Sequence, residues 1–158
     1  MSSTDSIFLD VDGTPGQVAE WMVVFLGFEV VGVEPERVVL RGRPAEAEGW
    51  LGVVVRRNGY VSPDPEPGEV QAIDGYGVEV SVKYDAKTEA VLHGETRRIF
   101  ERLVDGHPGV PMVLCEELAI LVAAHLPGAG TKYFDGEVTL DAPDVEVWRP
   151  WVSSRSHR

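Results

Sequence analysis

Residues 7 to 14 of this chain read Ile-Phe-Leu-Asp-Val-Asp-Gly-Thr, and the way in which they fold decides the architecture of the protein. From Ile7 to Val11 every second residue is aliphatic, which is the pattern of a half-buried strand. Asp10 and Asp12 fall outside this aliphatic set, so we expect both carboxylates to face solvent. Gly13 then allows the chain to turn sharply away from the strand.

An amphipathic helix is expected directly after this strand. Thr14 is a suitable N-cap residue, and Pro15 suits the first helical position, where its missing N–H costs no hydrogen bond. Gly27 is expected to end the helix. The apolar residues between them recur at spacings of three and four and form one face, made of Val18, Trp21, Met22 and Phe25.

The segment Phe8-Leu9-Asp10-Val11-Asp12-Gly13-Thr14 resembles the first motif of the haloacid-dehalogenase superfamily of phosphohydrolases. The resemblance implies that Asp10 is a nucleophile and Mg²⁺ ligand, that Asp12 is the general acid–base, and that the sheet is parallel and doubly wound. It also implies a strand-ending Ser or Thr, a phosphate-binding lysine and a late acidic pair. The late acids, Asp135 to Asp144, follow no apolar strand at a suitable distance, and the three lysines lie in no matching context. We therefore interpret the motif as non-catalytic, with the phosphohydrolase as the alternative.

The rest of the chain predicts an antiparallel sheet. Gly77 to Tyr84 alternates valines with polar residues and is the clearest strand, and a helix is expected from Asp85 or Thr88 to about Val104. Val110 to Leu126 favours a hairpin over a helix because its β-branched residues flank Cys115-Glu116-Glu117. Further strands are expected over 28–33, 37–43, 50–57 and 137–140. The predicted fold is α+β, mainly an antiparallel sheet of about six or seven strands with two principal helices.

Length and composition favour one globular domain spanning residues 1–158. An apolar share of 44% can form a core, and the chain is too short for two comfortable domains. The longest apolar stretch, 110–126, is interrupted by Glu116 and Glu117, so no membrane span is expected. The N-terminus lacks the basic and apolar parts of a signal peptide. A single cysteine, Cys115, is expected to be a buried thiol, and together these features favour the cytoplasm.

Charge is the strongest global signal. The formal net charge is −12, and no Lys or Arg occurs before Arg37 or between Tyr60 and Glu79. Such a field repels phosphate backbones, so nucleic acid is not an expected partner. It would attract a basic protein surface and speed its encounter with the chain. The four histidines lack ligand partners at fixed spacing, so neither a metal site nor a cofactor is expected.

Two acidic segments and two tryptophans are the candidate partner-binding residues. The segment at about 60–75 is a long acidic loop stiffened by three prolines, and long ordered loops tend to be functional. The tryptophans near the C-terminus either pin the tail onto the body or, if exposed, mark a contact site. A polar tail follows from about residue 153. The candidates are Asp64, Glu66, Glu69, Asp74, Asp135, Glu137, Trp148 and Trp151.

The layout also resembles the Sit family of swarm-toxin immunity proteins, over about the central four-fifths of the chain. The likeness lies in the helix end Phe25-Leu26-Gly27-Phe28, in the strand Gly77 to Tyr84 with the following Arg98-Ile99-Phe100-Glu101-Arg102-Leu103, and in the apolar segment Pro111 to Val122. In place of the glycine common in the last hairpin turn of that family, this chain has Cys115-Glu116-Glu117.

The family resemblance implies a small bacterial cytoplasmic protein that neutralises a toxin by binding it, and it implies no catalytic residues. We therefore expect a non-catalytic binding protein whose partner is a basic protein, most simply a toxin domain. The alternatives are the Mg²⁺-dependent phosphohydrolase that uses Asp10 and Asp12, and a secretion adaptor or scaffold.

Overall fold

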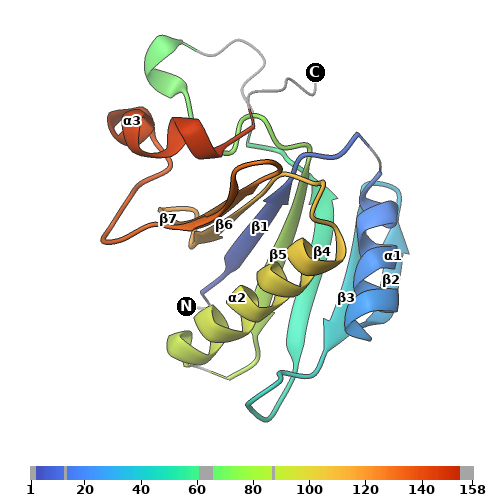
Figure 1. The fold of residues 1–158 in the computed structure, drawn as a ribbon. Helices are drawn as coiled ribbons and strands as arrows, with labels where there is room; N and C mark the ends of the chain where they lie inside the picture. Colours follow the sequence, from blue (N-terminus) through green and yellow to red (C-terminus); the bar gives the residue numbers. More distant parts are fainter. Residues whose placement is uncertain (1–2, 13, 61–65, 87, 154–158) are drawn as a thin grey trace.

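The computed structural model describes residues 3–12, 14–60, 66–86 and 88–153 (Figure 1). Within these residues, eight strands form one sheet in the order β2-β3-β4-β5-β1-β6-β7-β8, and every neighbouring pair is antiparallel. The strands are β1 (Asp5–Leu9), β2 (Glu29–Glu34), β3 (Arg37–Gly42), β4 (Leu51–Arg57), β5 (Val78–Tyr84), β6 (Met112–Glu116), β7 (Ile120–Leu126) and β8 (Gly130–Tyr133). The helices are α1 (Pro15–Leu26), α2 (Glu89–Gly106) and the short α3 (Val145–Trp148).

The α+β class and the antiparallel sheet are confirmed, and the sheet is larger than predicted. It has eight strands rather than six or seven, and α3 is a third helix. The added strand β8 covers residues 130–133, where no strand was expected from the sequence. The predicted strand at 137–140 is wrong, because only Thr139 pairs there, in an isolated bridge to Ile120.

Strand β1 lies in the middle of the sheet, between β5 and β6, and it is fully buried rather than half-buried as the sequence predicted. Ile7 pairs with Val80 on one side and with Leu114 on the other, so both edges of β1 are hydrogen-bonded. All five of its residues are buried, because both faces of the sheet are covered at this point. Asp10, which follows the strand, is only 4% exposed. The expectation that this carboxylate faces solvent is therefore wrong.

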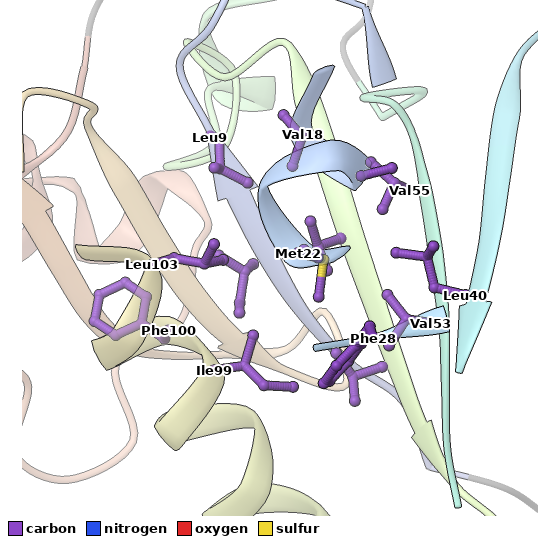
Figure 2. Close-up of a cluster of buried hydrophobic side chains, with 14 of the residues drawn as sticks. Leu9, Val18, Met22, Phe28, Leu40, Val53, Val55, Ile99, Phe100 and Leu103 are labelled. Carbon is purple, nitrogen blue, oxygen red and sulfur yellow. The ribbon is translucent and has the colours of Figure 1, made fainter. Parts of the chain in front are cut away.

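Helices α1 and α2 cover one face of the sheet. α1 packs over β3 and β4, and α2 packs over β1, β5 and β6. Figure 2 shows the core between these layers, where Met22 of α1 and Leu103 of α2 point toward the sheet. Gly27 ends α1 in the left-handed region, as predicted, with φ 74°. Thr14 occupies the N-cap position, but its side chain makes no cap hydrogen bond, so little of the usual cap stabilisation is expected from it.

The opposite face of the sheet is covered by two segments without long helices. Residues 66–76 and 134–152 pack on Phe8, Val113 and Leu121 and form a second buried cluster there. In Figure 1, α3 and the green turn near residue 70 lie together at one end of the molecule, away from α2. The buried thiol of Cys115 belongs to this cluster, as expected, and burial raises its pKa.

The hairpin prediction for 110–126 is confirmed by β6 and β7, and its turn has an unusual backbone. Glu117 and Leu118 have positive φ angles of 54° and 56°, and the Ala119 N–H donates to the Glu116 carbonyl. Consecutive positive φ angles with this hydrogen bond indicate a type I′ turn, which normally takes Asn-Gly. Two side-chain-bearing residues in this conformation are strained relative to glycine.

The described helices include none with the length and apolar character needed to cross a membrane.

Candidate partner-binding face

Two acidic segments that are far apart in the sequence lie side by side over the sheet face opposite α1 and α2. Gln71 and Asp141 form an antiparallel bridge, and the Gln71 side-chain amide donates to Asp141 Oδ1 over 3.3 Å. The Ala72 N–H also donates to the Leu140 carbonyl over 2.8 Å. We call the combined surface, made of residues 66–76 and 134–148, the acidic cap.

The acidic cap contains only one sign of charge. Its two segments hold eight carboxylates and contain no Lys, Arg or His. Those eight carboxylates contribute a formal −8, which is two-thirds of the net −12 of the chain. Six of the carboxylate side chains are exposed, and they belong to Glu66, Glu69, Asp135, Glu137, Asp141 and Glu146. The two segments of the cap therefore carry a large share of the net negative charge of the chain.

The two half-buried carboxylates of the cap hold its backbone in place. Asp74 accepts a hydrogen bond from the Gln71 N–H over 2.9 Å, and burial raises the pKa of Asp74. Asp144 accepts from both the N–H and the hydroxyl of Thr139, each over 2.8 Å, and these bonds lower its pKa. Because these two side chains are engaged within the cap, they order the segments that carry the exposed acids.

The first turn of the cap is built by a pair of glutamates. The Glu66 N–H donates to Glu69 Oε1 over 3.4 Å, and the Glu69 N–H donates to the Glu66 carbonyl over 2.9 Å. The Glu66 side chain in turn accepts from the Glu69 N–H. This reciprocal pair of bonds is a capping box at the short 3-10 helix η1 (Pro67–Glu69). Both glutamates remain exposed, so this turn presents them outward in a defined geometry.

Aromatic residues anchor the cap to the sheet. Trp148 is 3% exposed and donates from its indole nitrogen to the Asp141 carbonyl over 3.3 Å. Tyr76 is fully buried, and its hydroxyl accepts from the Ser153 N–H over 2.9 Å. Trp151 is half-buried against the same cluster. The tail is therefore pinned to the body, and the buried Trp148 is no longer a candidate for partner contact.

The other sequence-predicted candidates fall into three groups. Asp64 lies outside the described residues. Asp74 is half-buried and serves the internal structure of the cap. Four of the predicted acids are exposed, namely Glu66 and Glu69 in the first segment and Asp135 and Glu137 in the second, and the two segments meet at Gln71 and Asp141. Asp141 and Glu146 belong to the same unopposed acidic stretch of the sequence and are also exposed.

Asp10 is buried and hydrogen-bonded. The Ser153 hydroxyl donates to Asp10 Oδ2, and the Asp10 N–H donates to the Pro111 carbonyl over 2.9 Å. Asp12, two residues further on, is exposed. Among the described residues, no group of three or more His, Cys, Asp or Glu side chains is arranged to hold a metal ion.

A second polar cluster, which the sequence did not indicate, lies on the helix side of the sheet at the start of β1. Asp5 is the first residue of that strand and is 1% exposed, and His93 of α2 lies directly above it. No sequence signal pairs these two residues, because they are 88 positions apart. Their contact depends on how α2 packs across β1.

Comparisons with known proteins do not assign this chain to a family. No family model, no curated protein and no solved structure matches it significantly.

Proposed function

We propose that this chain is a non-catalytic binding protein whose acidic cap binds the basic surface of another protein. The observation that carries the proposal is the meeting at Gln71 and Asp141 of two acidic segments that contain no basic residue. A surface of one sign steers an oppositely charged protein toward it and raises the association rate. The same surface repels the phosphates of nucleic acids.

The anchoring of the cap supports a role in recognition. Trp148 and Tyr76 hold its base on the sheet, and Asp74 and Asp144 order its turns. A surface that is already ordered loses less conformational entropy when it binds, so more of the interaction energy appears as affinity. Val147 of α3 is 47% exposed within the acidic surroundings and offers an apolar contact at the same face.

The specific role that we propose is that of a bacterial immunity protein that neutralises a basic toxin in the cytoplasm by direct binding. The resemblance of the central strand, of the helix after it and of the last hairpin to toxin-immunity proteins favours this role. Binding alone can block a toxin, so the role needs neither a cofactor nor catalytic residues. A secretion adaptor or scaffold would use the same surface but would not protect cells from a toxin.

The phosphohydrolase alternative is less well supported. Its motif implies a doubly wound parallel sheet, whereas every strand pair here is antiparallel. Asp10, the residue that would attack phosphorus, is 4% exposed and hydrogen-bonded by Ser153.

Affinity capture from the producing cells tests the proposal. The wild-type protein is compared with a cap variant carrying Glu66→Gln, Glu137→Gln and Glu146→Gln, which neutralises both acidic segments. A matched control variant removes the same number of exposed acids from other parts of the surface, through Glu20→Gln, Glu36→Gln and Asp105→Asn. The proposal expects a basic protein that is captured by the wild type and the control variant and is lost with the cap variant. Equal capture by all three proteins would refute the role of the cap.

A further inference from the structure

Two carboxylates and an imidazole meet on the helix side of the sheet, opposite the acidic cap. Asp5 of β1 and Glu116 of β6 are direct cross-strand partners. His93 of α2 lies over both, with Nδ1 at 2.7 Å from Asp5 Oδ2 and at 3.8 Å from Glu116 Oε2. Like charges directly opposite each other destabilise a sheet. The arrangement therefore needs positive charge or a hydrogen-bond donor close by.

Asp5 lacks one of the donors that its carboxylate requires. Its Oδ1 atom is buried and has no hydrogen-bond partner among the described residues, whereas Oδ2 contacts His93. A buried, unsatisfied carboxylate oxygen is costly, and native proteins seldom retain one without a compensating ligand, water or role. Among the described residues, Asp5 Oδ1 is the only buried side-chain oxygen or nitrogen that has no hydrogen-bond partner.

A cavity adjoins this carboxylate. It has a volume of about 170 Å³ and is lined by Asp5, His93 and Glu116 on its polar side and by Leu114 and Val122 on its apolar side. A cavity of roughly 150 Å³ can hold a molecule the size of benzene. The space therefore suits a small organic molecule with one polar end.

The arginine that lines the cavity is already engaged elsewhere. Arg97 also lines the cavity, but its Nε atom pairs with Glu101 over 3.4 Å, and its guanidinium lies 4.2 Å from the centre of the Tyr133 ring. The surroundings add further negative charge, since Glu89 and Glu117 act electrostatically on His93 and Asp5. A ligand that brings a donor and a positive charge would complete the site.

We propose that this cavity binds a small organic ammonium ion, whose N–H groups donate to Asp5 and Glu116 and whose hydrocarbon part packs on Leu114 and Val122. An ammonium group supplies three donors and one positive charge, which match the unsatisfied Oδ1 atom and the two carboxylates. The described residues offer no cluster suited to a metal ion, and the apolar wall favours an organic cation over a hydrated inorganic one.

Protonation of the site competes with this ligand. Burial raises the pKa of Asp5 to about 6, and the hydrogen bond and charge of Asp5 contribute to a raised pKa of His93. The charged groups that line the cavity are Asp5 from β1, Glu116 from β6, and His93 and Arg97 from α2, and Glu117 and Glu89 act on Asp5 and His93 from nearby. Ammonium binding should therefore strengthen as pH rises from about 5 to about 8, while the site loses its protons.

Nuclear magnetic resonance titration with propylammonium chloride tests the site. Saturable shifts are expected at the backbone amides of Asp5, His93 and Leu114, and 1-propanol or sodium chloride should not reproduce them. Loss of a charged hydrogen bond at Asp5→Asn should weaken binding about tenfold or more. Glu116→Gln, at a half-buried position, provides a second variant if Asp5→Asn does not fold, and it should also weaken binding. Glu20→Gln is the exposed control and should bind like wild type.

Two results would overturn the inference. The first is a titration without saturable shifts at these three amides. The second is an affinity for propylammonium that stays the same in the folded Asp5→Asn and Glu116→Gln proteins or at pH 5 and pH 8. Neither result bears on the acidic cap, which lies on the other face of the sheet.

Discussion

The wild-type protein should become less stable as pH rises, because Asp5 of β1 is buried. Replacing Asp5 by asparagine should remove this loss of stability. Burial is the largest cause of the raised pKa of Asp5, and the hydrogen bond from His93 opposes it only in part. A carboxyl whose pKa is higher in the folded state binds its proton more tightly there than in the unfolded chain. The free energy of unfolding therefore falls as pH rises between the two pKa values.

The size of this effect follows from the two pKa values. The difference between 3.8 in the unfolded chain and about 6 in the fold corresponds to about 3 kcal/mol of unfolding free energy. His93 acts in the same direction, because its raised pKa gives stability that is present below pH 6.5 and is lost as pH rises through the folded value. Asparagine cannot ionise, and it also removes the anionic partner that raises the pKa of His93.

Urea unfolding from about pH 4 to about pH 8, in buffers free of amines, measures this effect. As pH rises from about 4 to about 7, the free energy of unfolding should fall by about 3 kcal/mol more in the wild-type protein than in Asp5→Asn. Asp105→Asn, at an exposed position, should follow the wild-type curve. Parallel curves for wild type and Asp5→Asn would refute the reasoning, because they would show that Asp5 ionises equally well in both states.

Three further substitutions test individual contacts by urea unfolding. Arg56→Leu should cost about 3 kcal/mol, because it removes the 2.8 Å ion pair to Glu79, which is 1% exposed; a loss below about 1 kcal/mol would contradict this. Glu117→Asn should gain about 0.5 kcal/mol, because asparagine suits the positive φ of 54° in the type I′ turn, whereas a destabilised variant would argue against strain there. Gly49→Ala should cost about 2 kcal/mol, because Gly49 has a φ of 100° and a Cβ would lie 2.4 Å from Asp85 Oδ1; unchanged stability would be inconsistent with this close approach.

Local patterns predicted most of the elements. The alternation of residues 77–84 gave β5, the apolar spacing in α1 and α2 gave both long helices, and the β-branched runs around 110–126 gave the hairpin. Strand β8 was missed because Gly130 to Tyr133 is a short edge strand with no buried residue and so no alternation. The segment at 137–140 has the composition of a strand, but it packs as a covering segment on the sheet.

Long-range contacts limited the prediction of the site. The acidity of residues 66–76 and 134–148 was visible in the sequence, but their contact through Gln71 and Asp141 spans 70 positions and has no local signal. Asp10 was expected at the surface because β1 looked half-buried, but Ser153 of the C-terminal segment contacts its carboxylate in the fold. The same limit applies to Asp5, whose contact with His93 depends on how α2 crosses the sheet.

The salt dependence of the association rate tests the role of the acidic cap most directly. The captured partner is immobilised, and its association with the wild-type protein, the cap variant and the control variant is measured at several ionic strengths. We predict that the association rate of the wild-type and control proteins falls steeply with added salt, and that the cap variant associates more slowly and with a flatter salt dependence. A cap variant that associates at the wild-type rate at every salt concentration would contradict the account.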